Sequence, residues 1–205
     1  MKATQPRKPS RAARQQRSKA TVEAIFEATA RVLESDGLTA LTTNHVARLA
    51  GVSIGSLYEY FDNKDALLVA WCERHISEVK ETADLMFASL ADTPPEAAIE
   101  LFIDGLLAMN QVRPKLKHIL MEELPKRLGL HPIVELDNHF ERRVTEYLRS
   151  KQGTLRDIDL ESMSYTIFRA GKAVTMSFFL EKQPLERLPS IRAALVDMIK
   201  RAFLP

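Results

Sequence analysis

Apolar residues recur every three or four positions through most of the chain, and no stretch alternates with the two-residue period of a strand. In the first helical stretch the stripe consists of Val22, Ile25, Phe26, Val32 and Leu33. This spacing predicts an all-α fold of about nine helices. The longer ones are expected over 20–35, 63–88, 96–111, 114–124, 132–151, 157–181 and 188–203, between proline and glycine breaks.

The segment 42–64 has the pattern of two short helices joined by a tight turn. Thr42 and Ser53 each precede a short apolar run, where a hydroxyl accepts a hydrogen bond from a first-turn N–H. Gly51 follows the first run, where a helix ends readily in the left-handed conformation. This arrangement indicates a helix-turn-helix, whose second helix presents its outer residues to DNA.

The order Ala50-Gly51-Val52-Ser53, then Gly55 to Phe61 (GSLYEYF), then Asn63-Lys64, resembles the TetR family of bacterial transcriptional regulators. The resemblance covers roughly residues 20–70. It implies an N-terminal three-helix DNA-binding domain and a larger helical domain for ligand binding and dimerisation. We expect a basic arm over 1–19, the DNA-binding domain over 20–64, and the effector-binding and dimerisation domain over 65–205.

Two kinds of DNA contact are expected. Hydroxyl and ammonium groups suit phosphates, and the resemblance assigns most of these positions to that role: Thr42, Thr43, Ser56, Tyr60 and Lys64. The resemblance places four residues toward the bases: Asn44, Ile54, Gly55 and Glu59. Ser53 and Tyr58 complete the predicted DNA-binding set, and packing of Tyr58 against the first helix is the alternative.

The resemblance also implies a small apolar or amphipathic effector inside the second domain, whose binding releases DNA. Large apolar residues and a few polar ones there are candidate ligand contacts: Phe87, Phe102, Leu106, Met109, Met121, Glu122, His139, Phe140, Arg143, Tyr165, Phe168, Arg169 and Met176. For each of them, ordinary packing is the alternative. Release requires the effector to bind the free arrangement more tightly than the DNA-bound one.

The last two predicted helices, 157–181 and 188–203, are expected to form a homodimer interface, as the resemblance implies. Their apolar stripes are Leu160, Met163, Ile167, Ala170, Gly171, Val174 and Phe178, and Ile191, Leu195, Met198, Ile199 and Ala202. Small residues allow close approach of a second helix. A dimer would contact two half-sites of a palindromic operator. Burial within the chain is the alternative use of these stripes.

Charge is distributed unevenly along the chain. Residues 1–19 contain seven basic residues and no acidic one, although the net charge of the whole chain is only +2. We expect a disordered arm that binds the DNA backbone or a minor groove, with a solubilising tail as the alternative.

Other features exclude several classes of protein. Cys72 is the single cysteine, which excludes an intrachain disulfide and fits a reducing cytosol. Cys72 and His75 are too few ligands for a closed zinc site, and no phosphate loop or catalytic set is recognisable. No cofactor, metal or enzymatic activity is predicted, and no membrane span.

The sequence therefore predicts a cytoplasmic, sequence-specific DNA-binding transcriptional regulator that associates with the nucleoid when bound. The simplest form is a repressor released from a palindromic operator by a small amphipathic ligand. A ligand-independent or activating regulator of the same fold is the alternative. The sequence names neither the effector nor the operator.

Overall fold

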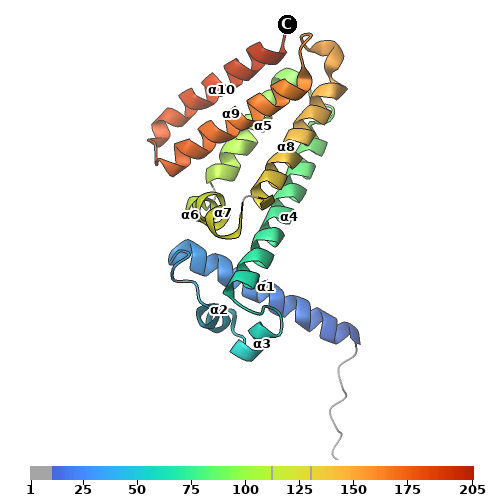
Figure 1. Ribbon diagram of the computed structural model, residues 1–205. Coiled ribbons are helices and arrows are strands. Elements are labelled where there is room, and N and C mark those ends of the chain that lie inside the picture. Colours follow the sequence, from blue (N-terminus) through green and yellow to red (C-terminus); the bar gives the residue numbers. More distant parts are fainter. Residues whose placement is uncertain (1–10, 112, 130) are drawn as a thin grey trace, which may run out of the picture. The chain divides into compact units, whose positions relative to one another are not determined.

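The computed structural model describes residues 11–111, 113–129 and 131–205 (Figure 1). These residues form helices joined by short connections, with no strand among them, as the periodicity predicted. The chain divides into two compact units, Met1–Trp71 and Cys72–Pro205. The sequence predicted the domain boundary after residue 64. The helix that begins at Lys64 continues through this position to Leu90, and the two units divide within it, after Trp71.

The first unit contains α1 (Arg11–Ser35), α2 (Thr43–Ala50), α3 (Ile54–Tyr58) and the start of α4 (Lys64–Leu90). α2 packs against both α1 and α3. The core of this unit consists of fully buried aliphatic side chains: Ile25, Val32, Leu33, Leu41, Val46, Leu57, Leu67 and Leu68. Because α2 and α3 are too short to be stable alone, this shared core holds them in place.

The ends of α1 show one confirmed prediction and one that was wrong. The helix ends at Ser35, and Gly37 has a φ of 82° and donates its N–H to the Val32 carbonyl. This left-handed residue was predicted to end the helix. The start, however, lies at Arg11, so residues 11–19 are helical and not part of a disordered arm. Alanine, arginine and glutamine favour helix strongly here. Residues 1–10 of the expected arm lie outside the described residues.

The second unit begins within α4 and continues through α5 (Pro95–Gln111), α6 (Pro114–His118), α7 (Leu124–Leu128), α8 (His131–Ser150), α9 (Leu160–Leu180) and α10 (Leu188–Phe203). A π-helical turn, η1 (Ile119–Glu123), joins α6 to α7, so the single helix predicted over 114–124 is replaced by three short elements. Short 3₁₀ turns lie at Gln152–Thr154 and Leu185–Arg187. π-helical turns occur often beside functional sites.

α5 lies at the centre of this unit and packs against both α9 and α10, while α9 also packs against α8 (Figure 1). Ion pairs reinforce the contact between α5 and α10. Arg192 binds Asp104 with two hydrogen bonds, and Lys200 binds Glu100 at 2.5 Å. These interactions lower the pKa of both carboxyl groups.

The packing on α5 changes which residues of the two C-terminal helices are exposed. Much of the stripe predicted for dimerisation is buried inside the chain: Leu160, Ile167, Gly171, Phe178, Leu195 and Ile199. Leu106 and Ile103 of α5 lie against Gly171. Val174 and Met198 of the predicted stripes are exposed, together with five small residues of the same helices: Thr166, Ala173, Ser177, Ala193 and Ala194.

Candidate functional site

α2 is fixed at both ends by the residues that the sequence singled out. Oγ1 of Thr42 accepts a hydrogen bond from the N–H of His45 at 3.1 Å. Gly51 has a φ of 69°, the left-handed conformation that a side chain would disfavour. Val46 and Ala47 face the core, so the opposite side of α2, with Asn44 and Arg48, is exposed.

α3 begins with a similar cap. Oγ of Ser53 accepts a hydrogen bond from the N–H of Ser56 at 3.0 Å and lies 2.9 Å from the Ser56 hydroxyl. Leu57 is the buried residue of this five-residue helix. Ile54 remains 38% exposed, and Gly55 is exposed beside it. The outer surface of α3 therefore combines an apolar side chain with a bare backbone.

Every predicted DNA-binding residue has at least part of its surface accessible. Seven are exposed: Thr42, Asn44, Ser53, Ile54, Gly55, Tyr58 and Glu59. Four are half-buried: Thr43, Ser56, Tyr60 and Lys64. Tyr58 is 48% exposed, and its hydroxyl lies 3.1 Å from Oγ1 of Thr43.

The start of α4 carries a cation and a cap. Oδ1 of Asn63 accepts a hydrogen bond from the N–H of Ala66 at 2.9 Å. Nζ of Lys64 lies 3.4 Å from the carbonyl oxygen of Leu38, a long bond that uses one of its three donors. The two other N–H groups of this ammonium remain available for an anion.

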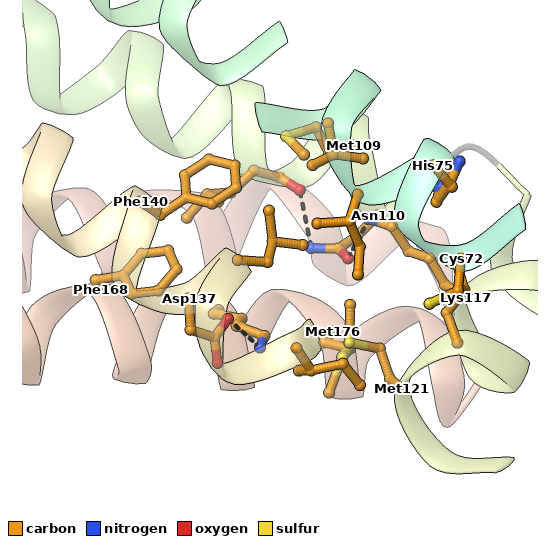
Figure 2. Close-up of a pocket in the computed structure, with 17 residues that line it drawn as sticks. Cys72, His75, Met109, Asn110, Lys117, Met121, Asp137, Phe140, Phe168 and Met176 are labelled. Atoms are coloured by element: carbon orange, nitrogen blue, oxygen red, sulfur yellow. Dashed lines mark hydrogen bonds and ion pairs between the residues drawn. The ribbon is translucent and has the colours of Figure 1, made fainter. Parts of the chain in front are cut away.

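The second unit contains a cavity that is partly open to solvent (Figure 2). α4, α5, α6, η1, α8 and α9 all contribute to its lining, which is mostly aliphatic, aromatic and methionine side chains. A second opening shares His75, Val79, Met109, Lys117 and Leu120 with the cavity.

The cavity has two chemically different ends. At one end the rings of Phe140 and Phe168 are stacked with their centroids 5.5 Å apart. At the other end lie His75, Cys72 and Lys117, as Figure 2 shows. An apolar body and a polar end are the features of a site for an amphipathic ligand.

A chain of hydrogen bonds orients the polar groups beside Lys117. Nζ of Lys117 donates to Oδ1 of Asn110 at 2.7 Å. Nδ2 of Asn110 donates to Oγ1 of Thr175 at 3.0 Å and to the carbonyl of Leu106 at 2.9 Å. Burial, and secondarily the nearby charge of Lys172, lower the pKa of Lys117 to about 8.

The carboxylate in the lining is already paired. Asp137 is only 7% exposed, and it binds Lys172 at 2.5 Å and Arg169 at 2.6 Å. Charge-assisted bonds of this kind satisfy a buried carboxylate. Asp137 therefore presents no unpaired negative charge to the cavity.

Six of the residues predicted to contact a ligand line this cavity, and six others among the described side chains do not. The six are Leu106, Met109, Met121, Phe140, Phe168 and Met176. Phe87 and Phe102 pack against each other instead, with centroids 5.8 Å apart. His139 and Arg143 bind Asp84 on α4, at 2.9 and 3.1 Å.

Tyr165 and Arg169 also lie outside the cavity lining. Tyr165 is 52% exposed and lies beneath the guanidinium of Arg169, 5.2 Å from ring centroid to Cζ. Arg169 reaches Asp137 from outside the cavity lining. The side chain of Glu122 lies outside the described part of the structure.

Sequence reasoning missed eleven lining residues: Cys72, His75, Ile76, Val79, Asn110, Lys117, Leu120, Ile133, Leu136, Asp137 and Lys172. One signal was available. Asn110 continues the buried stripe of Ile103, Leu106 and Leu107, at a helical spacing where an apolar residue is expected. A polar side chain at such a position indicates a local need for hydrogen bonding.

Cys72 is a buried thiol in the cavity wall. Burial, aided by Glu73, raises its pKa to about 11, so the reactive thiolate is scarce near neutral pH. Across residues 11–111, 113–129 and 131–205, no group of three or more histidine, cysteine or acidic residues is placed to hold a metal. None of the helices in these ranges is long and apolar enough to cross a membrane.

Two family models match the chain. The model "Bacterial regulatory proteins, tetR family" matches residues 25–71, and "Tetracyclin repressor-like, C-terminal domain" matches residues 94–201, more than half of the chain. The chain belongs to the TetR family. The chain therefore contains the helix-turn-helix of this family of regulatory proteins, and α2 and α3 are the two helices of that motif. TetR members and the relatives below are transcriptional regulators, not enzymes.

Individual relatives agree with this assignment. "HTH-type transcriptional regulator BetI 2" of Chromohalobacter salexigens is 35% identical over 99 residues, 48% of this chain and 44% of BetI 2. The match thus covers less than half of the length of BetI 2.

Two solved structures share the TetR fold. A TetR-family regulator from Mesorhizobium loti gives a TM-score of 0.80 over 92% of this chain and 99% of that chain, at 16% identity. The SmeT–triclosan complex gives 0.71 over 91% and 92%, at 20% identity.

Proposed function

We propose that this protein is a homodimeric repressor that binds a palindromic operator and is released from it by a small amphipathic ligand. The observation that supports DNA reading most directly is the outer surface of α3. Leu57 anchors the helix, while Ile54, Gly55 and Glu59 stay exposed on a capped, fixed segment. A recognition helix needs this combination, because base edges are read only by rigidly placed side chains.

We assign the DNA contacts by chemistry. Asn44 suits an adenine edge, Ile54 suits a thymine methyl group, Gly55 permits close approach, and Glu59 suits the cytosine amino group. Phosphates are bound by the hydroxyls of Thr42, Thr43, Ser53, Ser56, Tyr58 and Tyr60 and by the ammonium of Lys64. The seven basic residues of 1–19 add a sequence-independent attraction to the backbone.

The dimer is proposed to form through the exposed faces of α9 and α10. Ala173 and Val174 on α9, and Ala194 and Met198 on α10, are exposed. Small residues permit helices of a second copy to approach closely. A two-fold dimer is the commonest soluble oligomer and would match a palindromic operator.

Ligand release is proposed to act through α4. This one helix carries Lys64 in its first turn and contributes Cys72, His75, Ile76 and Val79 to the cavity. A ligand that favours one position of α4 changes the affinity for DNA by its differential affinity for the two arrangements. The SmeT–triclosan complex supports this proposal, since that relative in fold is described with a small molecule.

The test begins with DNA selected by the purified chain from a random pool. Selected sites should contain inverted half-sites, and fluorescence anisotropy should show binding to them. Ile54→Ala should change preference at one base position in each half-site, by about 1 kcal/mol or less. Leu85→Ala, at an exposed apolar residue of the second unit, is the matched control and should bind as the wild type does.

Four outcomes would contradict parts of the proposal. Selection without inverted half-sites contradicts the palindromic operator. A uniform loss of affinity in Ile54→Ala across operator variants contradicts base reading by that residue. If the affinity for the operator is the same with and without every ligand that binds the cavity, the protein is the ligand-independent regulator. If binding to the operator raises transcription, the protein is the activating regulator.

A further inference from the structure

Lys117 distinguishes the polar end of the cavity from an ordinary apolar core. It lines the cavity from the short helix α6, opposite the stacked rings of Phe140 and Phe168 (Figure 2). We propose that the cavity takes an amphipathic anion, an aliphatic chain ending in a carboxylate, with the carboxylate bound by Lys117 and the chain directed toward Phe140 and Phe168. This inference rests on the proposed function, because it specifies the effector of the same cavity.

The ammonium group of Lys117 has donors to spare. It has no carboxylate partner among the described residues, and its one hydrogen bond goes to Oδ1 of Asn110 at 2.7 Å. Asn110 cannot reorient freely, because Leu106 and Thr175 accept both of the hydrogen bonds from its Nδ2. Two N–H groups of the ammonium therefore remain for a ligand. A carboxylate can accept both.

The charges around Lys117 are mainly positive. Arg113 lines the second opening beside it, and Lys172 lies close enough to lower its pKa. Glu78 is the acidic group at this opening, but it is about half exposed and binds Arg74 at 2.9 Å. A half-buried cation in such surroundings is costly unless an anion joins it.

The lining also disfavours a cationic ligand. Asp137 is the carboxylate that faces the cavity in the described structure, and Lys172 and Arg169 already bind both of its oxygens. A cation would meet Lys117 without a free carboxylate to offset it. A neutral ligand would fill the apolar part but leave the ammonium unpaired. An anion is the class that satisfies both ends.

The apolar part of the lining fits a flexible chain. Met109 and Met176 lie between the aromatic end and Lys117 (Figure 2), and Leu106 and Leu136 also line the cavity. Methionine side chains adapt to varied ligand shapes. Asp137, which lies beside Phe168 in Figure 2, already has its two oxygens bound by Arg169 and Lys172 and needs no hydrogen bond from the chain. A single-headed amphiphile matches this pattern better than a ligand with polar groups at both ends.

The experiment uses three probes with the same ten-carbon chain: decanoate, decan-1-ol and decyltrimethylammonium. Binding to the full chain is measured by calorimetry at pH 7.0 without DNA. We expect decanoate to bind about ten- to a hundredfold more tightly than decan-1-ol, the ratio for one charge-assisted hydrogen-bonded contact. Decyltrimethylammonium should bind most weakly.

Lys117→Gln should reduce the preference for decanoate over decan-1-ol to less than about threefold and leave the decan-1-ol affinity unchanged, because only the charged contact is lost. Lys115→Gln is the matched control, since Lys115 is exposed on the same short helix and lies outside the cavity. Circular dichroism checks that both variants fold.

Proton uptake gives a second readout that needs no variant. Because the pKa of Lys117 is about 8, about half of the free protein carries its charge at pH 8. A bound carboxylate favours the ammonium, so decanoate should draw about half a proton per site from the buffer, and decan-1-ol none. Burial lowers the pKa of His75, with Glu78 opposing and Lys117 and Arg113 adding to the shift, so His75 stays neutral at this pH. Asp137 stays paired with Lys172.

Equal binding of the three probes, tighter binding of the cation, no binding of any probe, or an unchanged preference in Lys117→Gln would each overturn the ligand class. The proposed function fails separately. If decanoate binds as expected but does not change the affinity for DNA, the proposed release of DNA by a ligand is wrong. The proposal that the cavity binds an amphipathic anion is then still supported. If only a cationic or neutral compound releases DNA, the ligand class is wrong while release stands.

Discussion

The hydroxyl of Tyr58 on α3 lies 3.1 Å from Oγ1 of Thr43 on α2, so one hydrogen bond joins the two helices of the DNA-binding motif on their accessible side. α3 has five residues and one buried side chain, Leu57. Few contacts therefore fix its angle to α2. The Thr43–Tyr58 bond is one of them, and it holds two hydroxyls that we assign to phosphates in one arrangement.

Thr43→Val and Tyr58→Phe each remove this bond with little change in shape. Because both side chains are accessible, we expect each variant to lose less than about 1 kcal/mol of stability. We expect both to weaken operator binding, and the double variant to bind no more weakly than the weaker single one, since the two hydroxyls act together. Thermal unfolding and fluorescence anisotropy measure the two effects. Additive losses of DNA affinity would show that the hydroxyls act independently.

Lys64 tests the assignment of phosphate contacts. Its ammonium donates one long bond to Leu38 and retains two free donors. Lys64→Ala should weaken binding to operator and to unrelated DNA by similar factors, and reduce the slope of log affinity against log salt by about one. Lys64→Arg keeps the charge and should keep the slope. An unchanged slope in Lys64→Ala would remove Lys64 from the phosphate contacts.

The first unit was predictable because its signals are local. Gly37 and Gly51 adopt the left-handed conformation, and Thr42 and Ser53 cap α2 and α3, as their positions in the sequence indicated. The start of α1 was not found, because its basic residues suggested an arm. Charge and helix propensity are separate properties, and arginine and lysine favour both.

The cavity was only partly predictable, because its lining depends on how six elements pack. Size and apolarity identified Phe140 and Phe168, but they also suggested Phe87 and Phe102, which pack on each other. No periodicity indicates the π-helical turn at Ile119–Glu123, which contributes Leu120 and Met121. Lys117 has no local signal at all, since its burial is a result of tertiary packing.

Lys117 should make the stability of the protein depend on pH. Its pKa is about 8 in the folded chain against an ordinary 10.5, so the unfolded chain binds this proton more tightly. Charging Lys117 in the folded chain therefore lowers the free energy of unfolding, by an amount on the order of 3 kcal/mol. This cost is absent above pH 10.5, grows as the pH falls, and is complete below pH 8. Lys117→Met removes this cost and leaves Oδ1 of Asn110 unpaired, which costs about 1 kcal/mol.

We therefore expect Lys117→Met to be more stable than the wild type by about 1–2 kcal/mol at pH 6.5, and to lose that advantage by pH 10. Urea unfolding at the two pH values measures the difference. Cys72 also titrates at high pH, but it is present in both proteins and cancels. Lys115→Met is the exposed control and should show no such gain. A difference that is the same at both pH values would contradict the low pKa.

The exposed faces of α9 and α10 give the last prediction. Ala173 is exposed, and Met198 is 42% exposed. Each can therefore be changed with little effect on the fold of one copy. In a dimer built on these faces, a glutamate at either position would place a charge in a mostly apolar contact, opposite its own copy across a two-fold axis.

Ala173→Glu and Met198→Glu should accordingly shift the mass in light scattering from dimer to monomer, with an unchanged circular dichroism spectrum. Burying an unpaired charge costs several kcal/mol, which is enough to dissociate a contact of moderate affinity at micromolar concentration. Binding to a two-half-site operator should weaken in parallel, because each monomer then binds one half-site. Leu85→Glu is the control, since Leu85 is 73% exposed on α4 and should remain dimeric. A dimeric mass in both variants would place the interface elsewhere, and a monomeric wild type would remove the dimer from the proposal.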